Sequence, residues 1–277
     1  MTMVMHIMLP LALVGGAGAL LGQAVGRFSI ADDARPLATM AENLEHKIGE
    51  PVNYEDALYE YSGDLIDITK EVAAPDFVAS HPNYHVISMR RGSLVGEYDE
   101  AELKKSPETV LNRMITAYNL SNPPATFRLL TKSDGFIIVP DTVKKASGVL
   151  VGASRPLDTP ITIEPGTRSA RETLQILLRT LSAKNAVGLG SEPTNLIDQS
   201  TVTLQADNEP ARDVLMRFCS GLVWADSAMA ALGRHRRLAW GLYYDPGLKM
   251  YMLNLRVVML ERNVPYRQEP ELFPADY

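Results

Sequence analysis

The chain has 277 residues, of which 46% are hydrophobic and 22% charged, so most of it should fold as one large domain or as two of ordinary size. The formal net charge is −6. A protein that binds nucleic acid independently of the nucleic-acid sequence needs a basic surface, so this negative net charge argues against that class of function. The densest basic cluster, residues 234–237, is predicted to be a solvated loop.

The N-terminal segment has the features of an export signal. Residues 1–24 contain no Lys, Arg, Asp or Glu, and an apolar run covers 7–21. Small residues around Ala19 and Ala24 suit a signal peptidase, so 1–24 is predicted to be a signal peptide, although the usual basic start is missing. This predicts a periplasmic or secreted protein. The alternative is an uncleaved membrane anchor, although the run is short for a span.

The next stretch, residues 34–140, is predicted to form a first α+β module. Gly49 and Pro51 end its first expected helix, and Ser106 followed by Pro107 opens its second. Residues 64–80 have no clear pattern. The helices are expected at 36–48 and from 107 to the Asn122-Pro123-Pro124 stop, and the strands at 52–61, 84–89, 93–98, 126–130 and 136–139.

A connector at 141–157 is predicted to lead into a second α+β module at 158–258. Ser169 with Glu172 three residues later forms a capping box, which satisfies free amides at a helix start. Pro210 suits the first position of a second helix. The helices are expected at 169–185 and 210–222, and the strands at 160–164, 186–190, 201–205, 238–244 and 250–258.

The order of elements in the second module repeats that of the first: helix, strands, a helix opened by proline, then a hairpin with an Asp/Gly turn. The predicted fold class is therefore α+β, with two small modules, each with helices packed on a short mixed or antiparallel sheet. The proline-rich segment at 261–277 is predicted to be a flexible tail.

Part of the second module resembles a known family. The matching pieces are Val202-Thr203-Leu204-Gln205-Ala206-Asp207-Asn208-Glu209-Pro210, the Val214-Leu215 pair, and the strands at 240–244 and 250–255. They are similar to the short N-terminal domain of secretins and TonB-dependent receptors, an STN-like resemblance that is clearest over 158–258. The resemblance implies a periplasmic recognition module that touches another protein, and it carries over no catalytic residue.

Several side chains are candidates for a chemical role. Five carboxylates could include a paired acid and base, but an acidic solvated face is the more common use of such a cluster. Nearby tyrosines suit either a binding interface or strand packing. The carboxylates are Glu55, Asp56, Glu60, Asp64 and Asp67, and the tyrosines are Tyr54, Tyr59, Tyr61, Tyr84 and Tyr98.

The remaining candidates favour structural roles. His81 and His85 have an H-x-x-x-H spacing, but Pro82 disfavours the helix on which two such ligands would share a face, so a loop is predicted. The single cysteine, Cys219, lies in an apolar helical stripe and is predicted to be buried and structural, with no disulfide possible within one chain.

The predicted function is that of an exported, non-enzymatic module that binds an envelope protein, or itself, by strand addition at a sheet edge. The strand at 250–258 is expected to supply such an edge, which the tail at 265–277 would cover or release. The alternative is a periplasmic hydrolase with a site between the modules. No nucleic-acid partner, cofactor, metal or membrane span in the mature chain is expected, and no residue is assigned to a catalytic, cofactor-binding or metal site.

Overall fold

A computed structural model describes residues 25–224 and 235–260. The predicted signal peptide at 1–24, the predicted tail at 261–277 and Arg234 of the basic cluster lie outside these residues. Helices and strands are mixed through the described part, which confirms the α+β class. None of its helices is both long enough and apolar enough to cross a membrane.

The first half begins with a strand, a helix and a buried strand: β1 (Val25–Asp33), α1 (Pro36–Ile48) and β2 (Val52–Glu55). The stretch without a clear pattern then forms η1 (Ser62–Asp64), β3 (Leu65–Asp67), α2 (Thr69–Val72), α3 (Pro75–Ser80) and β4 (Ile87–Met89). The half ends with β5 (Gly92–Asp99), α4 (Glu100–Lys105), α5 (Pro107–Leu120), β6 (Ala125–Lys132) and β7 (Gly135–Lys144).

The second half follows the short elements β8 (Leu150–Gly152) and η2 (Pro156–Asp158). It contains β9 (Pro160–Ser169), α6 (Ala170–Asn185), β10 (Val187–Ser191), α7 (Thr194–Gln199), β11 (Ser200–Pro210), α8 (Ala211–Ser220), β12 (Leu222–Trp224), β13 (His235–Asp245) and β14 (Met250–Leu260). The predicted strand at 52–61 is shorter than expected, because β2 ends at Glu55.

Local chemistry explains where the main helices begin and end. Pro36 occupies the first turn of α1, and Gly49 ends the helix in a left-handed conformation with φ 80° that glycine tolerates without strain. At α6, the Ser169 hydroxyl accepts a hydrogen bond from the Glu172 amide at 3.1 Å, which confirms this half of the capping box. Pro107 lies in the first turn of α5.

The repeated order of elements is confirmed, and it extends to the strand pairing. β1 pairs with β5 and β9 with β11, both antiparallel. β2 runs parallel to β7, and β10 runs parallel to β14. The hairpin β6–β7 corresponds to β13–β14. Each half is therefore one copy of the same supersecondary unit, and the two copies are called the first and second repeat below.

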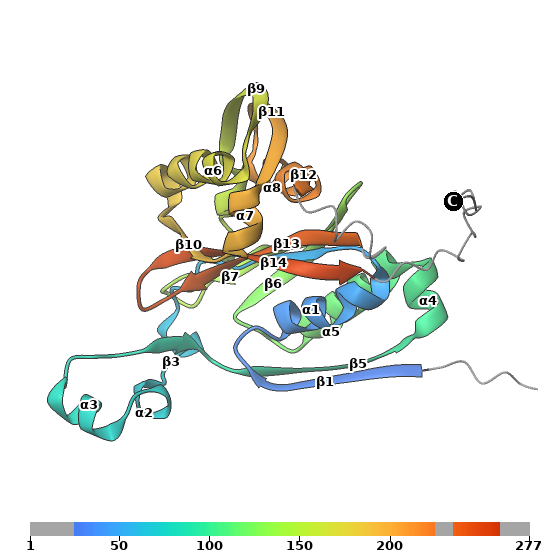
Figure 1. The fold of residues 1–277 in the computed structure, drawn as a ribbon. Coiled ribbons are helices and arrows are strands. Elements are labelled where there is room, and N and C mark those ends of the chain that lie inside the picture. The colour runs from blue at the N-terminus through green and yellow to red at the C-terminus, as the bar shows by residue number, and fades with distance from the viewer. Residues whose placement is uncertain (1–24, 225–234, 261–277) are drawn as a thin grey trace, which may run out of the picture.

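The two repeats build one central sheet. Its strand order is β10-β14-β13-β2-β7-β6, with β8 added to β7, and the repeats meet where β13 runs parallel to β2. Figure 1 shows α1 and α5 on one face of this sheet, with β1 and β5 beyond them, and α6, α7 and α8 on the opposite face with β9 and β11. The halves thus share a sheet, where the sequence predicted one sheet for each.

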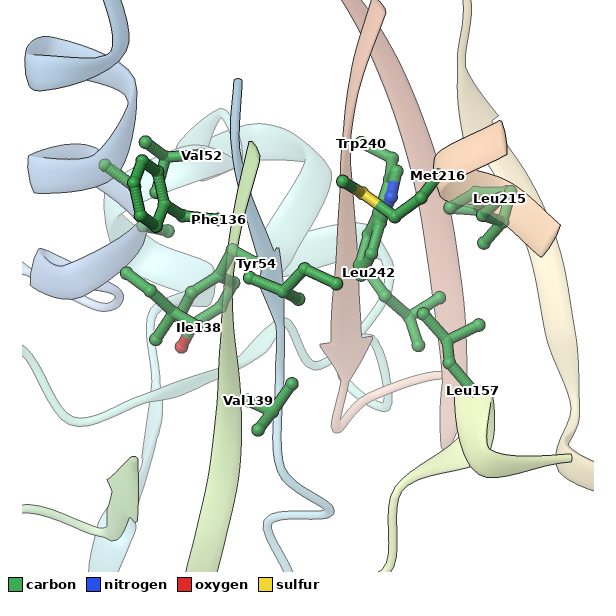
Figure 2. Close-up of a cluster of buried hydrophobic side chains, with 14 of the residues drawn as sticks. Val52, Tyr54, Phe136, Ile138, Val139, Leu157, Leu215, Met216, Trp240 and Leu242 are labelled. Carbon is green, nitrogen blue, oxygen red and sulfur yellow. The ribbon is translucent and has the colours of Figure 1, made fainter. Parts of the chain in front are cut away.

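The core also crosses the predicted connector. One hydrophobic cluster contains buried residues from both repeats, and Leu157, within the predicted connector, is fully buried in it. Figure 2 shows this region, where the residues come from β2, β7, η2, α8 and β13: Val52, Tyr54, Phe136, Ile138, Val139, Leu157, Leu215, Met216, Trp240 and Leu242. Independent folding of two modules stays a prediction, since neither the shared sheet nor the shared core tests it.

Candidate functional site: an open strand edge beside a pocket

Two of the candidate carboxylates are buried between the repeats, so the expectation of a solvated acidic face is wrong for them. Glu55 ends β2 and is fully buried. Its Oε2 accepts hydrogen bonds from Arg212 Nη2 at 2.6 Å and Nε at 3.2 Å, and its Oε1 accepts one from the Leu157 amide at 3.1 Å. Burial raises the pKa of Glu55, while Arg212 acts in the opposite direction.

Asp56 is equally buried and has more partners. Its Oδ2 accepts hydrogen bonds from Arg35 Nε at 2.6 Å and from the Tyr244 amide at 3.0 Å. Its Oδ1 accepts from the hydroxyls of Tyr54 at 2.9 Å and Tyr59 at 3.3 Å. Every carboxylate oxygen of Glu55 and Asp56 is thus bound to a group that joins elements of the fold. The pair acts as a structural junction, and no described contact supports it as an acid and base.

The other candidate acids and the histidines are scattered. Asp64 is also buried, so the expectation of a solvated face is wrong for it too, and its Oδ1 lies 3.3 Å from Lys144 Nζ. Asp67 Oδ2 lies 2.7 Å from His85 Nδ1, both half-exposed, whereas His81 Nδ1 contacts the Phe77 carbonyl. Glu60 is exposed. Within residues 25–224 and 235–260, no group of His, Cys, Asp and Glu is arranged to hold a metal ion.

Cys219 and most of the tyrosines belong to the core. Cys219 is buried in α8, as predicted, and burial raises the pKa of its thiol to about 12, so it stays protonated at neutral pH. Tyr54, Tyr59 and Tyr98 are buried, whereas Tyr61 is half-buried and Tyr84 exposed. Core packing therefore accounts for three of the five tyrosines, of which Tyr54 and Tyr98 lie in strands.

The strand at 250–258, which was predicted to have a free edge, has no free edge over its first half. β14 lies between β10 and β13, with Tyr251 to Asn254 paired to β10, so the expected edge at 250–258 is corrected over those residues. Tyr251, Leu253 and Leu255 of β14 are buried, as expected from the alternation of side chains along a strand. Within the described residues, β6 and β10 end the main strand order of the central sheet, and the short β8 adds a further edge beside β7.

Both central edges are partly blocked by side chains of the same chain. On β6, Asn119 Oδ1 accepts from the Phe127 amide at 2.9 Å, and its Nδ2 donates to the Phe127 carbonyl at 2.8 Å, as a neighbouring strand would. On β10, the Ser182 hydroxyl donates to the Val187 carbonyl. Such contacts protect an edge from pairing with another chain.

The outer sheets of the two repeats differ at one edge. In the second repeat β11 is flanked by β9 on one side and by β12 on the other, where Leu222 pairs with Val202 and Trp224 with Ser200. In the first repeat the corresponding strand is β5, which pairs with β1 and with no second strand among the described residues. The position that corresponds to β12 is therefore free of a strand.

The residues that follow α8 and α5 explain why only the second repeat has this additional strand. β12 follows α8 directly, as Leu222-Val223-Trp224. After α5 the chain continues as Ser121-Asn122-Pro123-Pro124, and the two prolines have no amide hydrogen to donate to a ladder. The segment after α5 is therefore poorly suited to form the counterpart of β12.

A pocket of about 360 Å³ occupies this place. Its wall contains the start of β5 (Gly92 and Ser93), which is the counterpart of the part of β11 that pairs with β12, together with the segment after α5. The cations Arg90, Arg91 and Lys144 also line it, with Asp64. Pockets that bind small ligands start at about 300 Å³, so the space can admit a few residues of a peptide.

The charges of the pocket are unevenly matched. Arg91 pairs with Asp32 at 3.0 Å and with Glu71 at 2.6 Å, and Lys144 pairs with Asp64. Arg90 is exposed, and its guanidinium makes no ion pair or hydrogen bond within the part of the chain that the structure describes. One cation of the pocket is thus available to an anionic group from outside.

The sequence contained a signal for this site that its separate elements did not reveal. Arg90-Arg91-Gly92 lies between two predicted strands and Asn122-Pro123-Pro124 stops a predicted helix. Neither feature indicates a site alone. Alignment of the two repeats would have shown a strand after one helix and a double proline after the other.

Comparisons with known proteins add no relative. No family model matches the chain, and no curated protein and no solved structure is similar to it. The STN-like resemblance thus stays a prediction.

Proposed function

We propose that the protein is an exported, non-enzymatic binding module of the cell envelope that takes up an extended segment of a partner protein by strand addition to β5. In this mode main-chain hydrogen bonds supply affinity, and alternating side chains supply selectivity. Periplasmic or secreted location is part of the proposal and rests on the uncharged apolar segment at 1–24.

One observation carries the proposal: the second repeat fills the edge of β11 with β12, and the first repeat leaves the edge of β5 without a strand. The same fold thus provides a precedent for an added strand at this place. Side chains are bonded to backbone groups of β6 and β10, whereas β5 adjoins a pocket.

No described observation favours the hydrolase. The pocket at the boundary between the repeats, lined by Asn53, Asp134, Cys219 and Arg237 among others, has no room for a water molecule. The buried carboxylates nearby are bound to Arg212 and Arg35.

A matched pair of variants tests the strand edge. Ser93 and Val95 lie two residues apart on one face of β5 and are both exposed, but only Ser93 lines the pocket. In pull-downs from envelope extract followed by mass spectrometry, the wild type and Val95→Trp should capture a common partner that Ser93→Trp loses. Equal capture by all three proteins would refute binding at this edge, as would a partner retained by Ser93→Trp alone.

A further inference from the structure

We infer that the pocket beside β5 binds the free C-terminal carboxylate of an extended peptide, with Arg90 as its cationic partner. This inference rests on the proposed strand addition and adds the chemistry of the partner. It follows from the direction of the precedent strand, the place of the unpaired cation and the size of the pocket.

The direction comes from the second repeat. β12 runs antiparallel to β11, from Leu222 opposite Val202 to Trp224 opposite Ser200, so it advances toward the beginning of β11. A peptide that pairs with β5 in the same way advances from Ser93 toward Arg90. Its C-terminal end therefore arrives at the arginines that precede β5.

The charge at that end suits a carboxylate. The guanidinium of Arg90 has no partner among the described residues. A guanidinium presents a planar fork of donors that matches a carboxylate in a bidentate geometry. Lys144, 17% exposed, shares the pocket and is 3.3 Å from Asp64, so a second cation lies nearby. Asp64 is neutralised by Lys144, which limits its repulsion of an incoming anion.

The polar groups after α5 complete the site. Ser121 and Asn122 are exposed and line the pocket together with the start of β5. Tyr118 contributes a largely buried ring to the same wall. An extended peptide would thus meet backbone groups of β5 on one side, hydroxyl and amide groups on the other, and Arg90 at its end.

The test uses two arrays of short peptides attached through their N-termini, identical except that one has free C-terminal carboxyls and the other C-terminal amides. Peptides that bind the full chain are then remade with a fluorescent N-terminal label for anisotropy titration. The free acids should bind up to about five-fold more tightly than the amides, which corresponds to the roughly 1 kcal/mol that an ion pair with an exposed arginine contributes. Arg90→Gln should remove this preference.

Controls separate the inference from the proposed function. Arg179→Gln changes an exposed arginine on α6, outside the pocket, and should bind as the wild type does. Equal binding of acids and amides, lost in Ser93→Trp, would overturn carboxylate recognition and leave strand addition standing. Acid-selective binding that persists in Arg90→Gln would overturn the role of Arg90, and no binding to either array would overturn both proposals.

Discussion

The two repeats share their order of elements and their strand pairing, yet they treat the edge of the outer sheet in opposite ways. In the second repeat β12 covers one edge of β11, whereas in the first repeat Pro123 and Pro124 leave the corresponding edge of β5 beside a pocket. Since the scaffold is the same, the difference arises from the few residues that follow α5 and α8. A duplicated unit can thus keep its fold in both copies and offer a binding edge in one.

The inner strands of the repeats differ as well. β2 and β10 occupy equivalent places, because Val52 pairs with Phe136 and Val187 with Tyr251, each one residue after the start of its partner strand. β2 continues with polar residues at Asn53, Glu55 and Asp56, where β10 has Gly188, Gly190 and Ser191. Polar side chains are therefore concentrated in the copy that faces the other repeat.

These polar groups connect the repeats directly. Asn53 Oδ1 accepts from the Trp240 amide at 2.8 Å, and Arg35, which binds Asp56, also donates to the Tyr244 carbonyl at 2.6 Å. Arg212 of the second repeat donates to Glu55 of the first. The glycines of β10 have no such side chains, so the same junction cannot form at the outer edge of β10.

The largest expected effect is the loss of the junction when Arg212 is replaced by methionine. Arg212 and Glu55 are 6% and 0% exposed, so the change leaves a buried carboxylate without its cation. Removing one partner of a buried pair costs about 3–5 kcal/mol of unfolding free energy. Chemical denaturation measures this loss.

A surface pair provides the control. Arg217 of the same helix binds Glu209, and their side chains are 40% and 36% exposed. Arg217→Met should cost no more than about 1 kcal/mol. Equal losses in the two variants would show that the buried pair does not hold the repeats together.

Glu45 forms a further contact between the repeats, and this contact depends on pH. It lies in α1 and accepts from Arg256 Nη2 of β14 at 2.8 Å, and burial raises its pKa from 4.5 to about 7 in spite of this partner. Because the pKa is higher in the folded state, the folded protein holds the proton more tightly. The resulting stabilisation is complete below pH 4.5 and is lost as the pH rises through about 7.

The magnitude follows from the same shift and is at most about 3 kcal/mol. Glu45→Gln should remove this component, so that the difference in unfolding free energy between wild type and variant changes with pH across this window. Denaturation curves at pH 5 and pH 8 compare the two proteins. A difference that is constant across the window would mean that Glu45 titrates normally.

Cys219 marks the core side of α8, and its replacement by serine should cost about 1–3 kcal/mol because a buried hydroxyl would lack a hydrogen-bond partner. Thermal or chemical denaturation gives the value. The native thiol should also react slowly with a maleimide, since it is buried and its pKa is raised to about 12. Rapid labelling of the folded wild type would contradict the burial.

Local signals in the sequence predicted much of the fold. Pro36 and Gly49 bound α1 as expected, Ser169 caps α6, and the repeat order follows from helix stripes and turn residues. The shared central sheet was not predictable in this way, because β13 and β2 are far apart in sequence and their pairing has no local signature.

The same limit applies to individual side chains. Glu55 and Asp56 look like members of an acidic surface segment in the sequence, and only the distant Arg212 and Arg35 make their burial possible. The pocket beside β5 combines residues near positions 34, 64, 90, 121 and 144, none of which is unusual in its own segment. The pocket is recognised as a candidate site only when the two repeats are compared in three dimensions.

The smallest expected effect concerns the edge that the chain protects by itself. Asn119→Ala removes both hydrogen bonds to Phe127 and should cost about 1 kcal/mol, since each net contribution is modest. The larger consequence is that β6 gains a free edge, which favours pairing with another chain. Sedimentation velocity should therefore show self-association at lower concentrations than in the wild type.

Asn112→Ala, on an exposed position of the same helix, is the matched control and should sediment as the wild type does. If Asn119→Ala also behaves as the wild type, the Asn119 contact does not protect β6, and the contrast between a closed central edge and an open β5 edge loses its basis.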